Sequence, residues 1–96
     1  MNTGTVSVHV IPSSASLDAI TIFFQDFEPG QGRMVVECYG NAWAAYWGAM
    51  GGKTVREFVR SADVYYLTNK LSRPNQNKTT DKYLQRLVEA IKADLK

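Results

Sequence analysis

The sequence contains only one cysteine, one histidine and three prolines in 96 residues. Because Cys38 has no second cysteine to pair with, an intramolecular disulfide is excluded, and a reducing compartment is the natural setting. A metal site needs several histidine, cysteine or carboxylate ligands in one place, and His9 and Cys38 supply only two. We therefore expect neither a metal ion nor a cofactor.

Long hydrophobic runs are also missing. The longest apolar stretch, residues 42–50, is much shorter than the roughly 20 residues of a membrane-spanning helix. Residues 1–16 lack the basic start and the unbroken apolar segment of a signal peptide. The sequence GGKT at 51–54 lacks the first glycine of the phosphate-binding pattern G-x-x-x-x-G-K-[ST]. These absences disfavour a membrane protein, a secreted protein and a P-loop enzyme.

What is present fits one small domain. Hydrophobic residues make up 45% of the chain and charged residues 21%, which are ordinary values for a globular protein. Aromatic residues reach 11%, and each such ring can bury about 150–250 Å². We expect residues 1–96 to form a single domain with one hydrophobic core.

Three segments in the first half have the alternation of β-strands. Residues 5–10 place three valines on one face, which is expected to be buried, and His9 on the other. Residues 20–25 and 33–39 alternate in the same way, with Cys38 sharing a face with Met34. Between them, residues 28–32 (EPGQG) form a turn in which proline presets φ and glycine accepts a positive φ. The second and third strands are therefore predicted to form a hairpin.

The segment from 41 to 50 is predicted to be a short helix. Trp43, Tyr46, Trp47 and Met50 have the spacing i, i+3, i+4 and i+7, which places them on one helical stripe. Asn41 would cap this helix, and the following glycines would end it. The aromatic stripe is interpreted as core, with a stacking platform for nucleic-acid bases as the alternative.

The second half is predicted to be helical. Thr54 and Glu57 form the capping-box pattern T-x-x-E, which opens one helix or two between 54 and 71, with Asp63 as a possible second cap. A last helix starts at Thr79 or Thr80, with a buried stripe. Its members are Leu84, Leu87, Val88, Ile91 and Leu95. The expected fold is α+β: a three-stranded antiparallel sheet with three or four helices packed on one face.

Catalytic residues are hard to find in this chain. His9 has no evident nucleophile or partner, and Cys38 has the setting of a buried small hydrophobe. Asp26 and Glu28 flank a turn without the spacing of a catalytic pair. The chain is therefore not expected to be an enzyme.

Charge is distributed unevenly. Residues 1–50 hold one arginine against four carboxylates, whereas residues 51–96 hold ten basic residues against five acidic ones. Basic residues of the second half are candidates for a binding surface that meets protein or nucleic acid. The candidate residues are Lys53, Arg56, Arg60, Lys70, Arg73, Lys78, Lys82 and Arg86.

Residues 19–71 resemble a family of small proteins from the early regions of enterobacterial phages and prophages. The resemblance is carried by DFEPG at 26–30, ECYG at 37–40, AYWGAMG at 45–51 and EF at 57–58. It implies a phage protein that acts in the host cytoplasm. Small phage early proteins often bind and inhibit host machinery, including host-defence complexes such as CRISPR effectors.

The resulting expectation is a phage-encoded inhibitor that blocks a host complex by direct contact, with an anti-CRISPR protein as its most specific form. The alternative is a nucleic-acid-binding accessory factor in phage replication or transcription. A homodimer, or the addition of a partner's strand to an unpaired edge, is left open.

Overall fold

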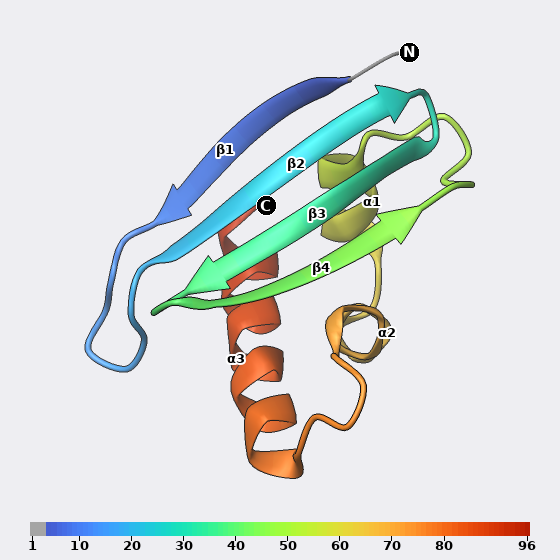
Figure 1. Cartoon of the computed structure of the whole chain (residues 1–96). Helices are drawn as coiled ribbons and strands as arrows, with labels where there is room; N and C mark the ends of the chain where they lie inside the picture. The colour runs from blue at the N-terminus through green and yellow to red at the C-terminus, as the bar shows by residue number, and fades with distance from the viewer. Residues whose placement is uncertain (1–3) are drawn as a thin grey trace.

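The computed structural model of the chain describes residues 4–96 as a four-stranded antiparallel sheet followed by three helices. The sheet is a simple meander in which each strand pairs with the next, and the helices cover one of its faces (Figure 1). The strands are β1 (Thr5–Ile11), β2 (Ile20–Glu28), β3 (Gln31–Cys38) and β4 (Asn41–Trp47). The helices are α1 (Val55–Ser61), α2 (Val64–Leu71) and α3 (Lys78–Asp94). The α+β class and the antiparallel sheet are confirmed, with four strands in place of three.

The hairpin of β2 and β3 forms as predicted. Its turn lies at Pro29 and Gly30, and Gly30 has a φ of 83°. The pairing shifts by one residue between Asp26 and Glu28, which marks a β-bulge at Phe27. The Pro-Gly pair therefore closes a hairpin whose strand end is locally irregular.

The predicted helix at 41–50 is wrong, because residues 41–47 form β4. Tyr39 and Gly40 both have positive φ, 52° and 82°, as the two central residues of a type I′ hairpin turn require. The turn sends the chain back along β3, and β4 then alternates between buried and exposed residues. Trp43 and Trp47, four residues apart, share a face in a strand as well as in a helix, so their spacing did not decide between the two.

The predicted burial of the β1 valines is also wrong. Val6, Val8 and Val10 are 57%, 55% and 55% exposed, on the sheet face away from the helices. Val8 pairs with Phe23, whose side chain points away from the core, and this register fixes the direction of every side chain in β1. The face turned toward the helices carries Ser7, His9 and Ile11.

Two helices, not one, occupy the segment from 54 to 71. Thr54 and Glu57 make the predicted capping box, and Asp63 caps α2 by accepting hydrogen bonds from two backbone amides. The last helix begins at Lys78 with Asn77 as its cap, one or two residues earlier than expected.

The core lies between the inner face of the sheet and the helices. Both indoles are buried, and each N–H finds an acceptor: Trp43 Nε1 donates to Gln76 Oε1 and Trp47 Nε1 to Tyr66 Oη, each at 2.9 Å. Tyr46, in contrast, points away from the core and is 53% exposed. The predicted stripe of the last helix, from Leu84 to Leu95, is fully buried.

Candidate functional site

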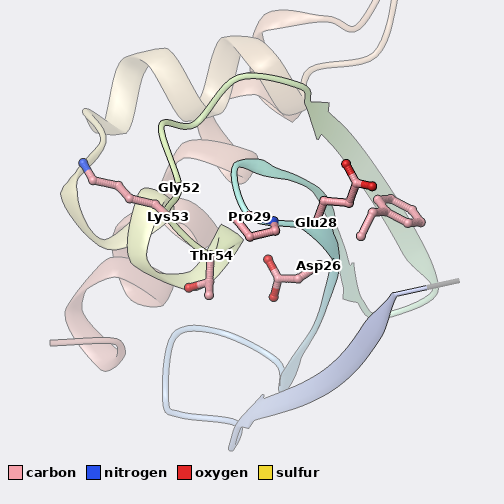
Figure 2. A pocket seen from close by; sticks show the side chains of 7 residues that line it. Asp26, Glu28, Pro29, Gly52, Lys53 and Thr54 are labelled. Carbon is pink, nitrogen blue, oxygen red and sulfur yellow. The ribbon is translucent and has the colours of Figure 1, made fainter. Parts of the chain in front are cut away.

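A shallow groove of about 280 Å³ lies between the β2–β3 turn and the loop before α1. Its lining comes from residues 26–29 and 52–54 (Figure 2). The groove coincides with the DFEPG segment that carries part of the family resemblance, so it is the natural place to look for chemistry.

The polar groups of this groove serve the fold. Asp26 Oδ1 accepts a hydrogen bond of 2.8 Å from the backbone N–H of Val55, the first residue of α1. Gly30 donates to Lys53 O and accepts from Met50 N, which binds the turn to the loop before α1. A side chain on Gly32 would lie 2.4 Å from Val55 Cγ2. These residues dock α1 against the hairpin.

The charged groups around the groove do not converge. Lys53 extends away from Asp26 and Glu28 (Figure 2). Hydrogen bonds from the backbone and side chain of Thr54 hold the carboxylate of Glu57 in the capping box, and the same hydrogen bonds lower the pKa of Glu57. The groove therefore offers neither a paired acid and base nor a cation site.

The two residues that sequence reasoning singled out for chemistry are both engaged elsewhere. Cys38 is buried, as predicted, and its Sγ lies 3.1 Å from Tyr83 Oη. That contact, together with burial, raises the pKa of Tyr83 to about 12. His9 Nε2 lies 2.5 Å from Asp94 Oδ2, which joins β1 to the end of α3. Within residues 4–96, no group of three or more histidine, cysteine or carboxylate side chains could hold a metal ion.

The eight basic candidate residues come from the helices and the loops beside them, and three of them contact an aromatic ring or a backbone carbonyl through their side chains. Lys53 and Arg60 interact electrostatically with Glu57. The guanidinium of Arg56 lies 4.9 Å from the Phe24 ring centre, and that of Arg73 lies 5.0 Å from the Trp43 ring centre. Arg86 donates to the carbonyl of Ser16 in the β1–β2 loop. The side chains of these three arginines therefore contact the sheet layer or its loops. Arg86 is exposed and lies one turn after Lys82 on α3, so these two share a helix face.

A different part of the predicted set meets an aromatic residue. Lys82 and Tyr65 line a groove of about 250 Å³ between α2 and α3. The other lining residues are Thr68, Asn69, Asp81 and Gln85. Lys70 and Lys78, both exposed, belong to the same two helices. We call this groove the α2–α3 surface, defined by Tyr65 and Lys82, with Lys78 one turn before Lys82 on α3. Lys70 lies five residues after Tyr65, so its side chain leaves α2 in a different direction.

Sequence reasoning missed two parts of the molecular surface. Tyr65, which was not among the candidate residues, is 67% exposed. The outer face of the sheet carries Phe23, Tyr46 and the β1 valines in the open. Periodicity identifies residues that share a face but does not show which face is covered.

A protein-family model described as a phage family, phiTE_072, matches residues 1–96. The chain belongs to this phage family. The match spans the whole chain, including the first strand and the last helix, which lay outside the resemblance seen in the sequence. Searches of curated proteins and of solved structures found no match. None of the helices within residues 4–96 is both long and apolar enough to cross a membrane.

Proposed function

We propose that this phage-family protein is a binding protein that inhibits a host complex by direct contact in the host cytoplasm. The carrying observation is Tyr65, which is 67% exposed beside the groove between α2 and α3. The other large apolar side chains left in the open are Val6, Val8, Val10, Phe23, Tyr39, Tyr46 and Tyr66. Exposed apolar and aromatic patches on a small domain are typical of interaction surfaces.

The α2–α3 surface is the contact we assign to the host partner. Tyr65 supplies a rigid aromatic group beside a groove, and tyrosine is among the residues that dominate binding energies. Lys78 and Lys82, one turn apart and both exposed on α3, place two positive charges at this surface, and these would suit an acidic patch on a protein. The most specific form of the proposal is an anti-CRISPR protein that blocks nucleic-acid binding by a CRISPR effector.

A capture experiment tests this assignment. The tagged protein is incubated with host lysate, and the captured proteins are identified by mass spectrometry. The double variant Tyr65→Ala with Lys82→Glu should capture the partner complex at least about tenfold less, because it removes one aromatic contact and reverses one charge.

The matched control is Tyr39→Asn with Lys96→Glu, which also changes one exposed tyrosine and one exposed lysine. Asparagine suits the positive φ at position 39. The control should capture as the unmodified protein does, and circular dichroism should show both variants folded. Equal capture by both variants would remove the α2–α3 surface from the proposal.

Direct nucleic-acid binding is the outcome that would replace this function. The purified protein is titrated with single-stranded and duplex DNA at several salt concentrations. Micromolar binding that falls steeply with salt, and that is lost with Lys70→Glu and Lys82→Glu, would favour the accessory factor in replication or transcription. We expect no such binding.

A further inference from the structure

The helices cover one face of the sheet and leave the outer face open (Figure 1). This outer face carries a regular array of side chains. The strand register arranges twelve of these residues in three rows that cross all four strands. The central row is Val8, Phe23, Val35 and Ala44. One outer row is Val6, Gln25, Arg33 and Tyr46, and the other is Val10, Thr21, Glu37 and Ala42.

The central row is apolar across its whole width, whereas each outer row carries one charge. Arg33 and Glu37 lie on β3, two residues to either side of Val35. The charges of the array therefore cancel, and neither an acidic nor a basic partner would be favoured by its net charge. The positive charge of Arg33 and the negative charge of Glu37 lie on the same strand at equal distances from the central row.

We propose that this face binds a second copy of the same chain, with a two-fold axis along the central row. Rotation about this axis places each strand antiparallel over its own copy, in the aligned packing that two sheets commonly adopt. The outer rows then exchange, so that Arg33 of each copy faces Glu37 of the other. Val6 meets Val10, and the large Tyr46 meets the small Ala42.

The contacts that Arg33 and Glu37 make within one chain leave each side chain able to bind its partner on the second copy. Arg33 donates through Nε to Gln25 Oε1 at 2.8 Å and its guanidinium lies 5.5 Å from the Phe27 ring centre, which leaves the other N–H groups of the guanidinium as donors. Glu37 Oε2 accepts from the backbone N–H of Gly40 at 2.9 Å, and a carboxylate can accept several hydrogen bonds. These contacts also hold the two side chains at the sheet surface before association.

The size of the face suits a reversible dimer. Four strands about 4.8 Å apart, each with about seven residues at about 3.3 Å, cover roughly 440 Å² of flat area. Two such faces with their side-chain relief approach about 1,000 Å², near the lower end of specific interfaces. We therefore expect a monomer–dimer equilibrium with a dissociation constant in the micromolar range, about 1–10 μM.

Sedimentation equilibrium of the full chain over a range of concentrations measures this association. Arg33→Glu should weaken the dimer by about a hundredfold, because the two-fold axis creates two repulsive pairs with Glu37. Glu37→Arg should do the same. The double variant Arg33→Glu with Glu37→Arg should restore affinity to within about threefold, because the exchanged charges match again.

Two further variants separate this dimer from other associations. Phe23→Lys puts a charge on the central row and should leave a folded monomer, whereas Lys82→Glu on the α2–α3 surface should not change the dimer. Pairing through the free edge of β1 would instead survive both single charge reversals. Dimers that persist in Arg33→Glu, a double variant that fails to recover while folded, or a chain that stays monomeric at about a hundred times the expected dissociation constant would each overturn the proposal.

Discussion

At the residue scale, the phenol of Tyr83 has a raised pKa. The Cys38 thiol beside it and its own burial raise the pKa of its phenol from 10.0 to about 12. The folded protein therefore holds this proton more tightly than the unfolded chain does. The stability that comes from this difference is complete below about pH 10 and is lost as the pH rises through about 12.

The variant Tyr83→Phe tests that linkage. It keeps the ring that packs 6.2 Å from Trp43 but has no phenolic proton. Between pH 9 and 12, we expect the free energy of unfolding, measured by urea denaturation, to fall less steeply in the variant than in the unmodified protein. Tyr39→Phe, at a site 79% exposed, serves as the control and should follow the unmodified protein. Parallel curves for all three proteins would contradict the expectation.

Two residues of the DFEPG segment connect the hairpin to α1. Asp26 caps the first amide of α1, and Gly30 exchanges two backbone hydrogen bonds with the loop before that helix. A Cβ on Gly32, just after the segment, would clash with Val55. The groove in Figure 2 therefore lies where the hairpin packs against the loop before α1.

At the scale of elements, Lys92 joins α3 to the end of α1. Its Nζ donates to the carbonyls of Val59, Arg60 and Ala62, at or just beyond the C-terminal end of α1. A positive charge at this end also interacts favourably with the helix dipole. Nothing in the periodicity of α3 singles out this lysine from its neighbours.

Lys92→Met should therefore lower the free energy of unfolding by about 1–2 kcal/mol, because it keeps the length of the side chain but removes the charged donor. The measurement is chemical denaturation at neutral pH. Lys96→Met, outside the helix and exposed, should change stability by less than about 0.5 kcal/mol. Equal effects of the two substitutions would assign no special role to Lys92.

Strand β4 shows how an element can be misread from its pattern. Trp43 and Trp47 are four residues apart, and this spacing places two side chains on the same face both in a helix and in a strand. The decisive feature is the turn at Tyr39 and Gly40, where two successive positive φ values reverse the chain. Type I′ turns usually contain Asn-Gly, Asp-Gly or Gly-Gly, and here only Gly40 fits that pattern, because position 39 is a tyrosine.

At the scale of the whole molecule, the sheet separates two surfaces of different character. The helices, and with them the α2–α3 surface, lie on one side of the sheet, and the other face of the sheet is left uncovered (Figure 1). Association through the array would leave both helical layers pointing outward. A dimer would then present two copies of the α2–α3 surface to a partner.

If both proposals hold, one dimer should bind two copies of the host partner site. Phe23→Lys should then weaken capture of a partner immobilised at high density by about tenfold or more, through loss of the second contact, while affinity in solution for a single partner molecule stays unchanged. Surface plasmon resonance with the partner immobilised at high or low density distinguishes these cases. Equal binding of the unmodified protein and the variant at high density would contradict a bivalent arrangement.

The sequence by itself determined the α+β class, the β2–β3 hairpin, the helix cap at Thr54 and the buried stripe of α3, and it left open whether Asp63 begins a second helix. Each of these depends on neighbours within a few residues, where φ preferences, capping atoms and periodicity act directly. Only the tertiary structure decided that β4 is a strand, that the β1 valines face solvent and that Arg56 and Arg73 stack on rings of the core. These features depend on which face the helices cover and on the register between strands, and period-two alternation is the same whichever face is buried.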